Sequence, residues 1–200
     1  LRLWSRGDDW ISTQLFWTGL GGYEPETVPV LYALAQRAAV TVDVGAYVGY
    51  FTIMAALANP AGRVIALEPF PASFERLQRN VSLNALPHVT CRNVAAGASA
   101  GSAELHHMDR GMSMAASLDP AHLAPWEHVT TRVPVVRLDQ LLEELGVERV
   151  DLIKVDVEAT EADVLEGARE VLQRDHPHIV CEVLSVESGR RLSEILGPLG

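Results

Sequence analysis

Lysine is nearly absent from this sequence. The 16 basic residues include a single lysine, Lys154, and the arginines are scattered, while 26 acidic residues bring the net charge to −10 at pH 7. A protein that binds nucleic acid without regard to its sequence needs a positive surface for the phosphates. The composition therefore argues against a nucleic-acid partner.

Cysteine is equally scarce, and long apolar runs are missing. Cys91 and Cys181 both fall in expected strands, which predicts two buried thiols and neither a disulfide nor a metal site. No apolar run approaches the ~20 residues of a membrane helix, and we recognise no signal peptide, so a reducing cytoplasm is the expected compartment. With 48% hydrophobic and 21% charged residues, the 200-residue chain is expected to be globular.

The most informative stretch runs from Thr41 to Glu68. Its β-branched residues, glycines and apolar spacings predict a strand, a tight turn, a helix and a second strand over residues 41–44, 45–49, 50–58 and 63–67. This is the βαβ unit of a Rossmann-like, mostly parallel sheet in a three-layer α/β sandwich. Ligands bind such sheets above the carboxyl ends of the strands, where Gly45 and Glu68 emerge.

Two ligand classes use a unit of this kind, and the glycine spacing separates them. A dinucleotide site needs G-x-G-x-x-G, so that bare backbone can approach a pyrophosphate. Counted from Gly45, the second position is Tyr47, whose side chain blocks that approach, and the third is Tyr50, whose side chain keeps the helix and the strand apart. A nicotinamide-dependent oxidoreductase is therefore a disfavoured alternative.

The pattern D-x-G-x-x-x-G, with an acid ending the next strand, instead resembles motif I of class I S-adenosylmethionine-dependent methyltransferases. The resemblance implies that Glu68 accepts hydrogen bonds from both ribose hydroxyls of the cofactor. It places the methionine end of the cofactor among Asp43, Gly45, Ala46 and Gly49, and the adenine end near Pro69, Asn93 and Ala95. Phe70 either stacks near the adenine ring or only packs under its loop.

The chain is expected to divide into an N-terminal helical cover, residues 1–40, and a methyltransferase domain, residues 41–200. In the cover, which holds two predicted helices, Tyr23 and Glu24 either contact the ligand or serve only in capping and packing. The class I sheet usually ends with a strand hairpin that this sequence does not reach. We therefore expect a domain truncated at its C-terminus, with one unprotected sheet edge.

Farther along the chain, apolar patterns predict a helix over 72–84, a strand over 89–94, and strands over 103–107 and 128–137 that pair as a hairpin. The irregular segment 109–126 inside that hairpin is the expected substrate loop. The histidines that flank it are expected to be surface or packed residues: His106, His107 and His122.

The second informative stretch begins at Asp139, which is expected to cap a short helix. It continues with a strand, a helix, a strand and a helix over 150–157, 161–174, 179–184 and 187–196. Asp156, Glu158 and Glu182, the last expected inside its strand, then cluster near strand ends. Buried carboxylates there need a metal, a cation, hydroxyl donors or Lys154 as partners. No ligand-spacing motif supports a metal, and we predict none.

Four phrases together resemble the FkbM family of class I methyltransferases: VDVGAYVGYFT, ALEP, VVRLDQLL and DLIKVDVEATEADVLEGAREVL. The last phrase is the most specific, because the family's I-K-x-D-x-E-G-x-E is matched at Ile153, Lys154, Asp156, Glu158 and Glu161. Ala159 stands where the family usually has glycine. Since alanine does not easily take a positive φ, the local backbone is expected to differ there.

The FkbM resemblance implies S-adenosylmethionine as the cofactor and O-methylation of a small-molecule acceptor, often a natural product or a sugar hydroxyl, and in some members an amine. Asp156 and Glu158 are the candidates for the catalytic base that removes the hydroxyl proton. In the alternative interpretation, Asp156 only holds the methionine amine and Glu158 only orders its loop. A non-catalytic domain that keeps the fold and binds a partner is the other functional alternative.

Overall fold

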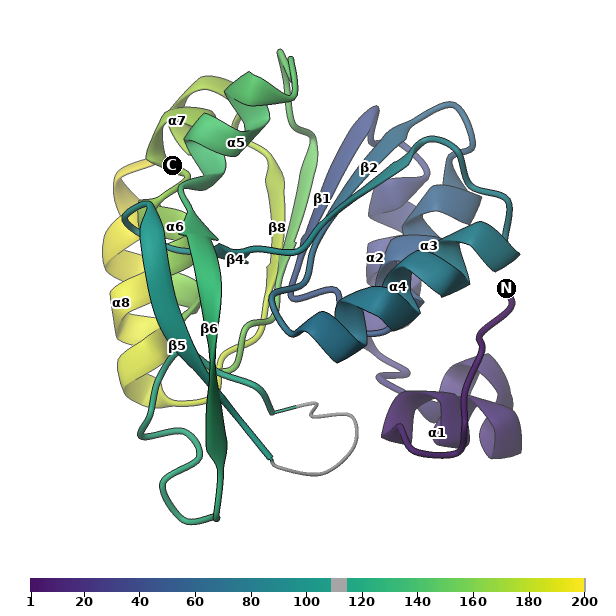
Figure 1. Ribbon diagram of the computed structural model, residues 1–200. Coiled ribbons are helices and arrows are strands. Elements are labelled where there is room, and N and C mark those ends of the chain that lie inside the picture. The colour runs from purple at the N-terminus through teal and green to yellow at the C-terminus, as the bar shows by residue number, and fades with distance from the viewer. Residues whose placement is uncertain (109–114, 200) are drawn as a thin grey trace.

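The computed structural model describes residues 1–108 and 115–199. At its centre lies a parallel five-stranded sheet with the strand order β3-β2-β1-β7-β8 (Figure 1). Its strands are β1 (Val40–Val44), β2 (Arg63–Leu67), β3 (Val89–Arg92), β7 (Leu152–Val155) and β8 (His178–Cys181). The chain extends the sheet from β1 first to one side and then to the other. The topological switch point, where such folds bind ligands, therefore lies between β1 and β7.

Helices cover both faces of this sheet, which confirms the predicted three-layer fold (Figure 1). One face carries α2 (Thr27–Ala35), α3 (Tyr50–Ala58) and α4 (Pro71–Leu83). The other carries α5 (Leu138–Glu144), α6 (Glu161–Glu166), α7 (Arg169–Asp175) and α8 (Val186–Leu196), which a short 3-10 turn, η2 (Gly197–Leu199), follows. Strand side chains alternate between the two cores: Val42 and Ile65 pack with the second group, Val64 and Ala66 with the first. Among the described residues, no helix is both long and apolar enough to cross a bilayer.

Two helices precede the sheet, where the sequence predicts them. α1 (Trp10–Thr18) leads through a 3-10 turn, η1 (Gly19–Gly22), towards α2. Asp9 caps α1, because its side chain accepts the Ser12 N–H at 2.7 Å. Arg76 of α4 pairs with Asp8 at 2.6 Å and with Asp9 at 3.1 Å. These contacts fix the start of the chain against the first helical layer.

A second, smaller sheet lies beside the first (Figure 1). Its strands are β4 (Ala95–Ala96), β5 (Gly101–His107) and β6 (Val129–Val136), in the order β4-β6-β5. β5 and β6 are antiparallel, with Ala103 opposite Val133, so the predicted hairpin is confirmed. The third strand predicted over 89–94 is present as β3, but it is shorter than predicted. It stops before Asn93, whose side chain donates to the carbonyls of Glu68 and Pro69 and holds the chain at the turn between the sheets.

The single helix predicted over 161–174 is also wrong, because the chain breaks into α6 and α7. The break falls at Gly167, where a Cβ atom would lie 2.1 Å from the carbonyl oxygen of Gly97. Asp139 does not cap its own helix. It lies inside α5 and accepts the N–H groups of Glu170 at 3.3 Å and Val171 at 3.0 Å, so it caps the start of α7. Contacts from distant segments thus replace one helix by two.

β7 and β8 are shorter than the strands predicted over 150–157 and 179–184. Glu182, expected inside a strand, follows the end of β8, and Asp156 follows the end of β7. The backbone N–H of each acid still bonds to the neighbouring strand, Asp156 to Val44 and Glu182 to Val155, both at 3.0 Å. Both acids are therefore held at the carboxyl edge of the sheet.

Candidate active site

The end of β1 and the end of β7 touch at the switch point. Gly45 has a φ of +81°, and a Cβ atom there would lie 1.7 Å from the carbonyl oxygen of Asp156. The N–H groups of Gly45 and Ala46 both donate to the carbonyl of Leu67 at 3.0 Å. The loop therefore needs glycine for its left-handed conformation and for this close approach.

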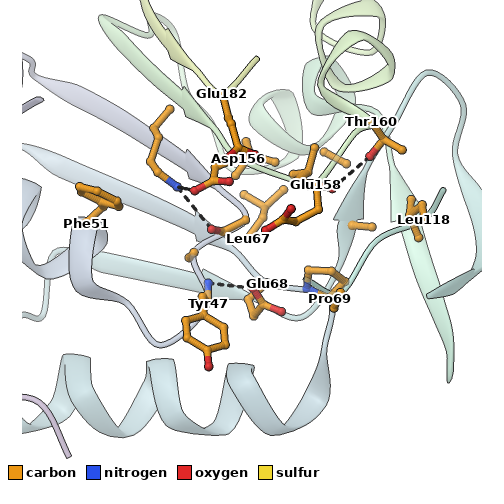
Figure 2. Close-up of a pocket in the computed structure, with 18 of the residues that line it drawn as sticks. Tyr47, Phe51, Leu67, Glu68, Pro69, Leu118, Asp156, Glu158, Thr160 and Glu182 are labelled. Carbon is orange, nitrogen blue, oxygen red and sulfur yellow. Dashed lines mark hydrogen bonds and ion pairs between the residues drawn. The ribbon is translucent and has the colours of Figure 1, made fainter. Parts of the chain in front are cut away.

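A pocket opens above these strand ends (Figure 2). Seven of the residues that the sequence predicts for the site line it: Gly45, Ala46, Glu68, Pro69, Ala95, Asp156 and Glu158. In Figure 2, Glu68 lies towards the α4 side of the pocket, while Asp156 and Glu182 lie together at the opposite side. The carboxyl ends of β2 and β7 thus bring the predicted acids to one cavity.

Four other predicted site residues are not among those that line the pocket. Asp43 is buried and accepts a hydrogen bond from the Thr52 hydroxyl at 2.5 Å. Asn93 bridges the carbonyls of Glu68 and Pro69 through its side chain. Gly49 lies directly before α3. Phe70 packs against His107, with the two ring centroids 4.5 Å apart.

Glu68 is buried at the end of β2 and braces both adjoining loops. One carboxylate oxygen accepts the N–H of Tyr47, the other that of Phe70, each at 2.8 Å. Burial raises the pKa of Glu68 to about 7, although these two N–H groups act in the opposite direction. The side chain links the loop after β1 to the turn after β2, and one face of it borders the pocket.

Lys154, the single lysine, lies buried between two carboxylates. Its Nζ atom is 3.4 Å from Asp43 and 3.1 Å from Asp156. Burial alone would lower the pKa of Lys154, but Asp156 and Asp43 raise it above its ordinary value. The sequence analysis named four possible partners for the acids: a metal, a cation, hydroxyl donors or Lys154. In the structure Lys154 is the partner of Asp156.

Three carboxylates gather beyond Lys154. Ligand oxygens of Asp156, Glu158 and Glu182 lie within 4.8 Å of one another, a spacing that a divalent cation could bridge but that acidic clusters also adopt without one. Burial raises the pKa of Glu158 to about 7 and that of Glu182 to about 8, with repulsion from Asp156 as the next cause in both cases. Each additional negative charge here is unfavourable unless a cationic group enters the pocket.

The sequence missed two residues that hold Glu158. His122 Nε2 lies 3.1 Å from a carboxylate oxygen of Glu158. Ser117, fully buried, donates its hydroxyl to the Glu158 carbonyl and pairs through its backbone with His106 of β5. Ala116 and Leu118 on either side of it line the pocket. The part of the predicted substrate loop around Ser117 thus borders the pocket, whereas 109–114 lie outside the described residues.

The expectation that the backbone at Ala159 avoids a positive φ is wrong. Glu158 has a φ of +58° and Ala159 a φ of +84°. Glu161, which is buried, accepts the Ala159 N–H at 3.1 Å, and the hydroxyl of Ser117 binds the Glu158 carbonyl. A local contact from Glu161 and a long-range contact from Ser117 therefore hold the backbone in the conformation that glycine would adopt without strain.

Ala159→Gly is consequently expected to stabilise the protein. Relief of a left-handed alanine is worth about 1–2 kcal/mol, less the added freedom of glycine in the unfolded chain, so the net gain is about 1 kcal/mol. Urea unfolding followed by circular dichroism measures it. Ala121→Gly, at an exposed loop position, is the control and should give no gain. A destabilised Ala159→Gly variant would show that the strain is absent.

The fold and the site define the class of protein. A doubly wound sheet with a glycine turn after β1, a buried acid after β2 and acids after β7 is the architecture of a class I methyltransferase, as expected from the sequence. The particular family follows from comparison with known proteins. Residues 43–196 match the model of the methyltransferase FkbM domain, and the chain belongs to that family.

Named relatives agree with this assignment. Methyltransferase 1 of Beauveria bassiana is 33% identical over 142 residues, which cover 63% of this chain and 57% of that protein. Methyltransferase sdnD of Sordaria araneosa is 28% identical over 155 residues, covering 64% of this chain and 60% of that one. The chain thus spans less than two thirds of either relative. An O-methyltransferase from Bacillus cereus, solved with S-adenosylhomocysteine, shares the fold with a TM-score of 0.56 at 18% identity, over 90% of this chain and 72% of that one.

The family is one of methyltransferases, and the sequence resemblance implies S-adenosylmethionine as the cofactor. The charges of the pocket fit it, because the cofactor carries a sulfonium and an ammonium group. Among the described residues, five carboxylates and one cation line the pocket: Glu24, Glu68, Asp156, Glu158 and Glu182, with Lys154. Lys154 is already paired, so the remaining negative charge is available to a positively charged ligand.

Proposed function

We propose that this domain methylates a hydroxyl group on a small organic molecule. The observation that carries the proposal is the placement of Glu158, whose half-buried carboxylate lines the pocket beside Asp156 with its pKa raised to about 7. A base whose pKa lies close to the working pH combines a useful ionised fraction with sufficient proton affinity. Glu158 has both properties at the end of β7.

In the proposed reaction, each residue of the site has a separate role. When bound, the cofactor supplies a methyl carbon made electrophilic by the sulfonium. Glu158 takes the proton of the acceptor hydroxyl, and His122, 3.1 Å away, holds the carboxylate in place. Positioning of the two reactants can contribute about 7–11 kcal/mol, and a well-placed base about 10²–10⁴-fold in rate. Asp156, held by Lys154, helps to orient the reactants.

We assign the rest of the pocket to the cofactor. Each oxygen of Glu68 accepts one backbone N–H, which leaves further lone pairs for the ribose hydroxyls. Gly45 and Ala46 form the floor beneath the methionine end, and Pro69 and Ala95 lie on the adenine side. We also assign residues 1–40 the role of a cover over the pocket of the 41–200 domain. The presence of Ile11, Tyr23 and Glu24 among the lining residues supports this assignment.

Two measurements on the full-length protein test the proposal. Calorimetry should detect binding of S-adenosylhomocysteine, and incubation with S-adenosylmethionine and a panel of hydroxylated metabolites should release S-adenosylhomocysteine and an O-methylated product, identified by mass spectrometry. Cofactor binding with no turnover across the panel would favour the non-catalytic alternative. If only amines were methylated, the domain would be an N-methyltransferase and the proposed O-methylation would be wrong.

Glu68→Ala is expected to weaken binding of S-adenosylhomocysteine by about 1–3 kcal/mol, because the ribose hydroxyls lose a charged acceptor. Calorimetry measures the change, and the unfolding midpoint reports any effect on the two loops that Glu68 braces. Glu75→Ala, on the exposed side of α4, is the matched control. An unchanged affinity in a folded Glu68→Ala variant would place the ribose elsewhere.

A further inference from the structure

Glu24 reaches the pocket from outside the methyltransferase sheet. It follows η1 and lines the cavity together with its neighbour Tyr23. The Tyr23 ring packs against the rings of Tyr50 and Phe51, with centroid distances of 6.0 Å and 6.1 Å. The Tyr50 hydroxyl donates a hydrogen bond to the Leu20 carbonyl at 3.3 Å. These contacts to the first turn of α3 hold the segment in a defined place over the loop after β1.

The backbone at Glu24 is strained, and its side chain does not explain the strain. Glu24 has a φ of +42°, a conformation that non-glycine residues rarely adopt. Its carbonyl accepts the Val28 N–H at 3.0 Å, so the backbone and not the carboxylate serves the start of α2. Glu26, the residue directly before α2, makes no side-chain capping bond either. Capping therefore does not account for the acid at position 24.

The Glu24 carboxylate also forms no ion pair with any cation that the structure describes. The cation in this pocket, Lys154, is held by Asp43 and Asp156, although the charge of Glu24 still acts on it. Burial, and after it the charge of Glu24, raises the pKa of Tyr23. A half-buried carboxylate thus faces the pocket without a compensating positive charge.

We propose that Glu24 binds the ammonium group at the amino-acid end of the cofactor. This inference rests on the proposed function. Glu68 lies at the end of β2, and Gly45 and Ala46 lie at the neighbouring end of β1. A ligand whose ribose is held by Glu68 and which crosses this glycine floor brings its far end towards Lys154 and Glu24. A charge-assisted hydrogen bond there supplies the missing partner of Glu24.

Two ligands that differ at this end test the assignment. S-adenosylhomocysteine carries the ammonium group, whereas 5′-methylthioadenosine has the same adenosine and sulfur but no amino-acid end. Calorimetry on the full chain should show that Glu24→Gln weakens S-adenosylhomocysteine about 10- to 100-fold and leaves 5′-methylthioadenosine unchanged. Glu26→Gln, an exposed change of the same charge two residues away, should alter neither affinity.

The outcomes separate the two proposals. Equal weakening of both ligands by Glu24→Gln would assign Glu24 to the shape of the pocket, and no weakening of either would remove it from the site; both results overturn the ammonium contact and leave the methyltransferase proposal standing. A wild-type protein that binds neither ligand would overturn the proposed function and this assignment together.

Discussion

Lys154→Met is expected to destabilise the protein by about 3–5 kcal/mol, because the buried carboxylate of Asp43 and the partly exposed one of Asp156 lose the cation between them. Asp43 and Lys154 face each other in the register of β1 and β7, and the Lys154 side chain is 5% exposed and that of Asp43 3% exposed. Without the ammonium group, one of the two acids must take up a proton or remain charged in an apolar layer. Urea unfolding at pH 7 measures the loss.

The controls isolate the buried charge. Asp43→Asn combined with Lys154→Met should recover part of the lost stability, since one uncompensated acid is gone. Arg149→Met breaks the surface pair with Asp151, where Arg149 is 73% exposed, and should cost about 0–1 kcal/mol. A Lys154→Met variant as stable as the wild type would mean that Asp43 and Asp156 do not depend on this lysine.

Glu158→Gln is expected to lower the rate of methyl transfer about 10²–10⁴-fold, because the amide cannot accept the proton of the acceptor hydroxyl. Affinity for S-adenosylhomocysteine should change little, since Glu158 is assigned to the acceptor side. The measurement is kcat with the acceptor that the release assay identifies, with Glu127→Gln, an exposed change of the same kind, as control.

The pH profile of the wild type adds a second readout. Burial raises the pKa of Glu158 to about 7, and only the ionised carboxylate is a base, so the rate should be low below pH 7 and rise to a plateau above it. This rising limb should be lost in Glu158→Gln. A full rate in that variant, with the limb intact, would move the base to Asp156.

Most of the fold is predictable from the sequence, because its main elements are locally encoded. The stretch from Thr41 to Glu68 contains its own strands, turn and helix, and the hairpin of β5 and β6 pairs segments close along the chain. The break at Gly167 is different, since its causes are the Gly97 carbonyl and the Asp139 carboxylate. No periodicity within the helix itself contains that information.

In the candidate site, too, some residue positions follow from the sequence and others depend on contacts between distant segments. Parallel strands place Glu68, Asp156 and Glu158 at one edge, so their proximity follows from the order of the strands. Asp43 was expected at the cofactor, but strand alternation directs its side chain to the α3 side, where it meets Thr52. His122 reaches Glu158 only through the folding of a long irregular loop, and no local pattern marks it.

The rarity of lysine has a practical consequence for following this molecule in solution. Lys154 carries the one side-chain amine in these 200 residues, and while it is clamped between acids it stays protonated, which makes it a poor nucleophile. Acylating reagents should therefore spare it in the native state and modify it once β1 and β7 separate. The mass increment at Lys154, separated by peptide mapping from that at the α-amino group, would then count the molecules whose central strands have opened.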